Sequence, residues 1–233
     1  MIESPPRLEE LERVAAELET APPEQIVRWA VGRYEPAIAL ATSFGAEDMV
    51  LLDMLARIQE RPRAFFLDTG LHFPETYALR DRVVAAYPQL DLEVIRPRLT
   101  VEQQERAFGP ALWRRDPDRC CALRKVEPLE RALRPLSAWV TGLRREQAPT
   151  RRNIRVVEWD RRHGLVKVNP LARWRQREVW RYIREHGLPY NPLHDRGYPS
   201  IGCQPCTSPV ADGEDPRAGR WRGLGKTECG LHV

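Results

Sequence analysis

The chain has 233 residues, 42% of them hydrophobic, which is enough to bury the core of one domain of ordinary size. The net charge is only +4 and no basic run is interleaved with aromatic residues, so we expect no nucleic-acid partner. The longest apolar stretch, around 49–55, is interrupted by Asp53, which argues against a membrane span. The start Met1–Pro6 lacks a basic segment followed by an apolar one, so we predict a cytoplasmic protein without a signal peptide.

The first half of the chain alternates between helical and strand patterns. Apolar residues keep helical spacing over 7–33, and Pro22-Pro23 interrupts them, which predicts two helices. The continuous apolar run Pro36–Ala41 is typical of a buried parallel strand. The patterns that follow predict, in chain order, a helix ending near Ile58, a strand at 64–67, a helix at 74–87, a strand at 92–95 and a helix at 100–107.

The second half begins with a turn-rich segment, 108–119, that leads into a helix predicted over 121–133. The later patterns predict a strand at 138–141, a polar arginine-rich loop at 144–153, a hairpin or two strands at 156–159 and 165–168, and a helix at 176–186. After Leu188, proline and glycine are so frequent that we expect little regular structure. Strands that alternate with helices predict an α/β fold with a doubly wound, mostly parallel sheet.

The loop after the first strand has the composition of an anion-binding turn. Thr42, Ser43 and Gly45 offer hydroxyl groups, a small residue and free backbone N–H groups, which suit a phosphate. In a parallel sheet, this loop and Asp68 after the second strand lie at the same carboxyl edge, where ligands bind. An ordinary strand-to-helix turn with Ser43 as the helix cap fits these residues equally well.

Four of the five cysteines form two pairs, the vicinal Cys120-Cys121 and a C-x-x-C pair, Cys203 and Cys206. In a cytosolic protein such pairs indicate metal binding or redox chemistry rather than structural disulfides. A zinc site, a redox pair and an iron–sulfur site all remain open for the C-x-x-C pair. Adjacent cysteines strain a mononuclear tetrahedral site but reach two irons of a cluster more readily, so the vicinal pair favours iron–sulfur over zinc.

Cys229 is left as a lone thiol near the end of the chain, and we predict that it is a nucleophile. Arg217, Arg220, Arg222 and Lys226 precede it closely. Cations stabilise a thiolate, and the planar fork of arginine also suits phosphate or sulfate. The competing interpretations are a disordered tail and an arginine excess that merely reflects a G+C-rich genome.

Four motifs in this order resemble the assimilatory sulfonucleotide reductases, and within them the iron–sulfur adenylylsulfate (APS) reductases. The motifs are CCALRKVEPL at 120–129, TGLRREQ at 141–147, GCQPC at 202–206 and ECGLH at 228–232. The resemblance covers about residues 36–232. It implies an adenine-nucleotide α-hydrolase-like sheet, which agrees with the doubly wound architecture predicted above.

The resemblance also implies roles for individual residues. It implies one 4Fe-4S cluster held by Cys120, Cys121, Cys203 and Cys206. Lys125 would be the cation between the cluster and the substrate. The substrate contacts that it implies are Arg151, Arg217 and Arg220 around the phosphosulfate, and Thr42 with its neighbours Ser43 and Gly45, Leu67 and Gly142 around the nucleotide.

This sequence departs from the family pattern in two places. Phe44 precedes Gly45, where many iron–sulfur members have serine, and the tail before Cys229 is shorter and lacks the usual tryptophan-rich run. We nevertheless expect two parts: residues 1–206 as the nucleotide-binding and iron–sulfur domain, with N-terminal helices at 7–33, and 207–233 as a mobile tail that carries the catalytic cysteine.

The reaction that the resemblance implies is thioredoxin-dependent reduction of adenosine 5′-phosphosulfate (APS) to sulfite and AMP, in sulfate assimilation and cysteine biosynthesis. Cys229 would attack the sulfur atom and become S-sulfocysteine. With four cysteines bound to iron, no further thiol remains to resolve this intermediate, so an external dithiol such as thioredoxin is required. The oligomeric state stays open, a homo-oligomer included.

Three other interpretations compete with this one. An ATP-pyrophosphatase-type enzyme of the same fold carries Ser-Gly-Gly-x-Asp-Ser at the phosphate loop, which residues 42–48 do not fit. A zinc-stabilised nucleotide-binding module would make Cys229 a bystander. Reduction of the 3′-phosphorylated nucleotide (PAPS), or of both nucleotides, is a closer alternative, although PAPS-specific members generally lack the four cluster cysteines.

Overall fold

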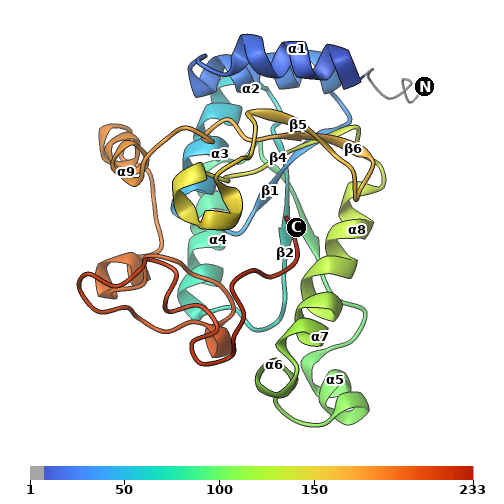
Figure 1. Ribbon diagram of the computed structural model, residues 1–233, viewed down its shortest axis with the longest axis vertical. Coiled ribbons are helices and arrows are strands. Elements are labelled where there is room, and N and C mark those ends of the chain that lie inside the picture. The colour runs from blue at the N-terminus through green and yellow to red at the C-terminus, as the bar shows by residue number, and fades with distance from the viewer. Residues whose placement is uncertain (1–7, 233) are drawn as a thin grey trace.

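The computed structural model describes residues 8–232 (Figure 1). Its six strands form one sheet in the order β3-β2-β1-β4-β6-β5. The strands are β1 (Ile38–Thr42), β2 (Arg63–Leu67), β3 (Asp91–Ile95), β4 (Ala138–Val140), β5 (Val157–Asp160) and β6 (Leu165–Val168). Neighbouring strands are parallel except β5 and β6, which form an antiparallel hairpin. The predicted doubly wound, mostly parallel sheet is therefore confirmed.

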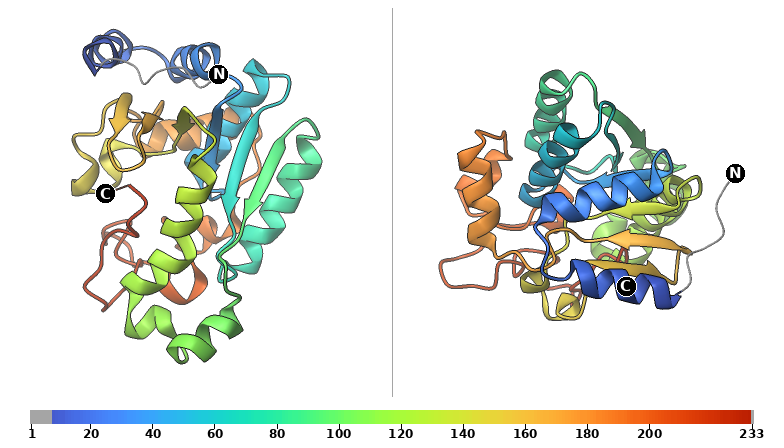
Figure 2. Two further views of the ribbon diagram at one scale, coloured as in Figure 1. Left: turned by 90° about the vertical axis from the view of Figure 1, so that its right-hand side faces the viewer. Right: turned by 90° about the horizontal axis from the view of Figure 1, so that it is seen from above.

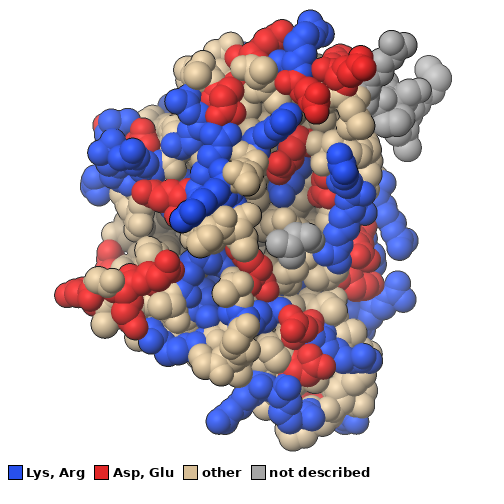
Figure 3. All heavy atoms as spheres, viewed as in Figure 1, with Lys and Arg blue, Asp and Glu red and all other residues tan. Residues whose placement is uncertain are grey.

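Helices cover both faces of this sheet (Figure 2). They are α1 (Leu8–Leu18), α2 (Pro23–Tyr34), α3 (Ala46–Ile58), α4 (Pro74–Ala86), α5 (Val101–Phe108), α6 (Leu112–Arg115), α7 (Pro117–Cys121), α8 (Glu127–Leu133) and α9 (Gln176–Glu185). Alternate strand residues point to opposite faces: Leu40 and Phe66 join the core under α2, α3 and α9, whereas Ala39 and Phe65 pack with α8. On the face shown in Figure 3, basic and acidic side chains are interspersed, in keeping with the small net charge.

The sequence-based boundaries fail mainly around 108–119. This segment was expected to be turn-rich, but it contains α6 and the start of α7. For α7 the reason is local: the Asp116 side chain accepts a hydrogen bond from the backbone N–H of Arg119, and Pro117 occupies the first helical position. The predicted helix at 121–133 is present as α8, preceded by one π-helical turn, Ala122–Val126.

Met1–Pro6, on which the prediction of no signal peptide rests, lies outside the described residues. Among the helices of residues 8–232, none has both the length and the apolar character needed to cross a membrane. After Leu188, the described chain contains only the short 3₁₀ helices Pro192–Arg196 and Gln204–Cys206, as expected.

Candidate active site

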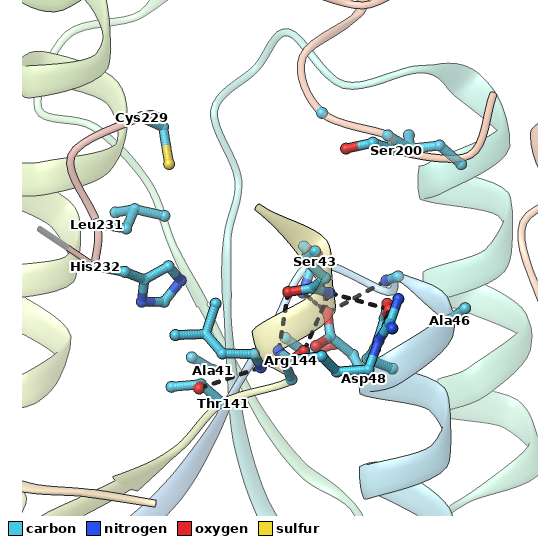
Figure 4. Close-up of a pocket in the computed structure, with 18 of the residues that line it drawn as sticks. Ala41, Ser43, Ala46, Asp48, Thr141, Arg144, Ser200, Cys229, Leu231 and His232 are labelled. Carbon is cyan, nitrogen blue, oxygen red and sulfur yellow. Dashed lines mark hydrogen bonds and ion pairs between the residues drawn. The ribbon is translucent and has the colours of Figure 1, made fainter. Parts of the chain in front are cut away.

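A cavity of about 440 Å³ opens at the carboxyl edge of the sheet. Strand order reverses between β1 and β4, and such a switch point is where open α/β sheets bind ligands. The cavity brings together the predicted substrate-binding and catalytic residues, namely Thr42, Ser43, Gly45, Leu67, Lys125, Gly142, Arg151, Arg217, Arg220 and Cys229. In Figure 4, Cys229, Leu231 and His232 lie on one side of this pocket and Ser200 on another, with Ser43 and Asp48 on its floor.

The loop after β1 does not present free backbone N–H groups. The N–H groups of Ser43 and Gly45 donate to Oδ2 of Asp48 over 2.7 and 3.2 Å, and the Ser43 hydroxyl donates to the same oxygen over 2.8 Å. The N–H of Phe44 donates to Oγ1 of Thr42 over 3.0 Å. The donors expected to receive a phosphate are thus bonded within the loop. The helix begins after Gly45, so Ser43 is not its cap.

Asp48, in the first turn of α3, is a buried carboxylate that faces the predicted phosphate loop. Its burial raises its pKa to about 6, against the hydrogen bonds from Ser43, which lower the pKa. Gly142, across the switch point, approaches it closely: a Cβ on Gly142 would lie 2.7 Å from Oδ1 of Asp48. Only glycine therefore allows the end of β4 to pack this tightly against the start of α3.

Phe44 helps the loop after β1 to keep its shape. Its backbone is left-handed, with φ of +57°, which is uncommon for a residue other than glycine. Its ring is fully buried and packs against Phe66, with ring centroids 5.1 Å apart. Burial of this ring offsets the local backbone cost and holds the loop in place.

Lys125 is the cation that joins this cavity to a second, smaller one. It lies in the π-helical turn 122–126, directly after the vicinal cysteines, and it lines both cavities, as does Trp221. Burial opposes the charged form of Lys125, but its electrostatic interaction with Cys203 and Cys229 outweighs burial and raises the pKa. A charged lysine thus lines both cavities.

The ring of Trp221 lies beside three cations: Lys125, and Arg220 and Lys226 of the C-terminal segment. The guanidinium of Arg220 lies 4.4 Å from the centroid of its ring, and the ammonium groups of Lys125 and Lys226 lie 6.0 and 5.8 Å away. Cation–π contact of this kind is worth about 0.5–2 kcal/mol, more when the groups are desolvated. The 2% exposed indole therefore holds several positive charges beside the cavity.

The second cavity is lined by the four paired cysteines: Cys120, Cys121, Cys203 and Cys206. The vicinal pair ends α7, and an antiparallel bridge between His72 and Cys203 brings the C-x-x-C loop beside the end of β2. No group of three or more His, Cys, Asp or Glu side chains within residues 8–232 is arranged to hold a single metal ion.

The donor set nevertheless fits a group that carries several positive charges. Burial, followed by repulsion from the other thiolates, raises the pKa of Cys120 to about 11 and that of Cys206 to about 12. Four neighbouring thiolates are therefore stable here only with cations among them. Polar groups already face the sulfurs: Oγ1 of Thr69 lies 3.3 Å from Sγ of Cys203, and Nε2 of Gln104 lies 4.0 Å from Sγ of Cys120.

His232 is the main site residue to which the sequence analysis assigned no role. Its partly buried ring lines the cavity and stacks on Trp139, and desolvation, with the charges of Lys167 and Arg151, lowers its pKa well below the usual value. It is therefore a neutral imidazole at physiological pH. The signal was available, because His232 belongs to the same ECGLH motif as Cys229.

Comparison with known proteins agrees with this geometry. Residues 37–209 match the family described as "Phosphoadenosine phosphosulfate reductase domain". A Gloeobacter violaceus protein named phosphoadenosine 5′-phosphosulfate reductase is 59% identical, over 96% of this chain and 93% of its own length. A Staphylococcus epidermidis protein named adenosine 5′-phosphosulfate reductase is 52% identical, over 92% of this chain and 88% of its own length.

Solved structures agree as well. The structure of phosphoadenylyl-sulfate (PAPS) reductase from Candida auris in a phosphate complex has a TM-score of 0.78 and 35% identity, and it covers 88% of this chain and 98% of that one. Candida glabrata FMN adenylyltransferase, 16% identical with a TM-score of 0.58 and coverage of 89% and 68%, shares the fold alone. The motifs, the switch-point cavity and these relatives agree, and the chain belongs to the phosphoadenosine phosphosulfate reductase domain family, the sulfonucleotide reductases.

Proposed function

We propose that this protein reduces adenosine 5′-phosphosulfate to sulfite and AMP in assimilatory sulfate reduction. The observation that carries the proposal is a shared cavity: the lone thiol of Cys229 opens into the same space as Lys125, Arg151, Arg217 and Arg220, at the carboxyl edge of the sheet. The Staphylococcus epidermidis relative is named for this substrate. A nucleophile, several cations and a switch-point pocket together suit attack on an anionic sulfonucleotide.

The first half-reaction is a displacement at sulfur. The Cys229 thiolate attacks the sulfur atom of the substrate, an S–S bond forms, and the bond from sulfur to the bridging phosphate oxygen breaks. AMP leaves with the electron pair of that bond, and Cys229 becomes S-sulfocysteine. Lys125, Arg217 and Arg220 offset the charge that accumulates when one anion attacks another.

The second half-reaction needs an external dithiol, for which thioredoxin is our proposal. One of its thiolates attacks Sγ of Cys229 and releases sulfite, and its second thiol then closes a disulfide and frees Cys229. The other four cysteines line the neighbouring cavity, so they are committed elsewhere. Access for a protein partner requires that the segment 207–233 can leave the cavity, which is the mobility predicted from its composition.

We further propose that Cys120, Cys121, Cys203 and Cys206 hold one 4Fe-4S cluster. Their convergence on one cavity and their mutual repulsion as thiolates support it. The bound cluster supplies positive charge that stabilises the four thiolates and links the segments that carry them. Both half-reactions move electrons in pairs, so no step requires the cluster to change its redox state. A visible absorption spectrum of protein purified without air separates this proposal from a colourless zinc module.

The test uses wild-type protein, reduced thioredoxin and either APS or PAPS under anaerobic conditions. We expect sulfite and AMP from APS, and, when the dithiol is omitted, one sulfonate group on the Cys229 peptide by mass spectrometry. PAPS reduction is the second candidate, because the 59% identical relative is named for it. A kcat/KM higher with PAPS than with APS would replace the substrate proposed here.

A further inference from the structure

Glu228, the residue before Cys229, is held by the cations of the cavity. Its carboxylate accepts hydrogen bonds from Nε and Nη2 of Arg151 over 3.0 and 2.9 Å and from Nη2 of Arg217 over 3.2 Å. The hydroxyl of Thr150 adds a fourth bond over 3.1 Å. The Glu228 side chain is only 10% exposed, so this is a sheltered ion pair rather than a surface contact.

The carboxylate of Glu228 and the guanidinium groups of Arg151 and Arg217 stabilise one another in this partly desolvated site. Burial alone would raise the pKa of Glu228, but the hydrogen bond and charge of Arg151 outweigh it and lower the pKa. Burial and the nearby Arg151 lower the pKa of Arg217 to about 10, so Arg217 stays protonated at neutral pH. Without the carboxylate, two arginines would face each other with no anion between them.

Other contacts hold the flanks of the C-terminal segment. Lys226 pairs with Asp118, beside the vicinal cysteines, and Nη1 of Arg162 donates to the carbonyl of Gly230 over 2.9 Å. The partners in these two contacts, Asp118 and Arg162, are not among the cations expected to bind the substrate anion. The carbonyl of Thr227 also accepts a hydrogen bond from Nη2 of Arg217, over 2.9 Å. Among the contacts of the described residues 226–232, those of Glu228 differ because they take up both Arg151 and Arg217, the cations expected at the phosphosulfate.

We propose that Glu228 is a positioning residue that fixes Cys229 at the cavity by occupying Arg151 and Arg217. The inference rests on the proposed function and deepens it. The fork of Arg151 then serves the C-terminal segment, and the substrate anion relies on Lys125, Arg220 and the N–H groups of Arg217 other than Nη2. Glu228 thus lowers the affinity for the substrate anion and improves the placement of the Cys229 thiol. Its loss should therefore strengthen substrate binding and impair the placement of the nucleophile.

The test compares Glu228→Gln and Glu228→Asp with wild type and with Glu214→Gln. Glu214 lies in the same segment, but its ion pair with Arg222 is exposed, so it is a matched control. The first measurement needs no substrate: the alkylation rate of Cys229 by iodoacetamide, followed on its peptide by mass spectrometry. The rate is taken from the plateau of its pH profile, so that a changed thiol pKa does not enter. The second measurement is kcat and KM for APS.

For Glu228→Gln we expect the plateau alkylation rate to rise about tenfold, kcat to fall about tenfold, and KM for APS to fall because two arginines become free. Glu228→Asp keeps the charge on a shorter arm and should lie between Gln and wild type, while Glu214→Gln matches wild type. If Glu228→Gln does not fold, as judged by its cluster absorbance and Tm, the alkylation rate and the kinetic constants of Glu228→Asp test the inference instead.

Two results would overturn the inference: an alkylation rate within twofold of wild type, or a KM that rises together with the fall in kcat. If wild type fails to reduce APS but Glu228→Gln still exposes Cys229, the positioning role stands and the proposed function falls. The two ideas therefore fail separately.

Discussion

The imidazole of His232 stacks on the indole of Trp139, with ring centroids 5.5 Å apart and ring planes inclined by 17°. Trp139 lies in β4 and is 1% exposed, so the end of the chain packs against the sheet itself. Leu231 packs beside it, against the cluster that includes Leu129. The position of Cys229 thus depends on apolar contacts that lie beyond it in the sequence.

Replacement of His232 separates stacking from hydrogen bonding. Because this imidazole is neutral, His232→Phe should keep the C-terminal segment packed and retain most of kcat. His232→Ala loses an aromatic pair worth roughly 1 kcal/mol and the area it buries, so kcat should fall about tenfold. Steady-state measurements of kcat for both variants test this expectation. Equal losses in the two would show that a hydrogen bond from the ring, rather than stacking, is what matters.

Cys229→Ser should abolish sulfite release. The hydroxyl is a far weaker nucleophile than a thiolate, and the cations of the cavity cannot compensate. Because Cys229 lies outside the cavity of the four paired cysteines, the brown colour and nucleotide binding should be unchanged. Sulfite assays, the visible spectrum and AMP titration check these points. Sulfite release by Cys229→Ser at the wild-type rate would show that another residue is the nucleophile.

Lys125→Ala should slow formation of S-sulfocysteine by about 10²-fold, because a buried positive charge is removed from a site where negative charge accumulates. Lys125→Met is the matched variant, since it keeps much of the side-chain volume beside Trp221 without the charge. Single-turnover measurements should show both variants slow. A normal rate in Lys125→Met would mean that packing, not charge, explains the loss in Lys125→Ala.

The buried carboxylate of Asp48 should make the protein less stable as pH rises. Its folded pKa of about 6 lies above the ordinary value of 3.8, so between these values the folded state holds a proton that the unfolded state releases. The free energy of unfolding then falls as pH rises from about 4 to 6, by up to roughly 3 kcal/mol. Wild type minus Asp48→Asn, measured by anaerobic urea unfolding across this range, isolates the effect. A pH-independent difference would show that the hydrogen bonds of the loop keep Asp48 ionised throughout.

The sequence by itself determined the order of elements, the parallel sheet and the division of the cysteines. These features depend on local patterns, such as the apolar run before Thr42 and the spacing of Cys203 and Cys206, which neighbouring residues in the chain specify directly. The same patterns did not indicate the short helix 117–121, which a side-chain cap from Asp116 begins.

The tertiary structure decided which charges meet. Asp48 takes up the donors of the loop after β1, and Glu228 takes up Arg151, from 77 residues away in the sequence. His232 reaches Trp139 in the same way, across most of the second half of the chain. Composition cannot specify such pairs, because an ion pair or a stacked ring depends on a few ångströms of approach that only the packed sheet and its loops set.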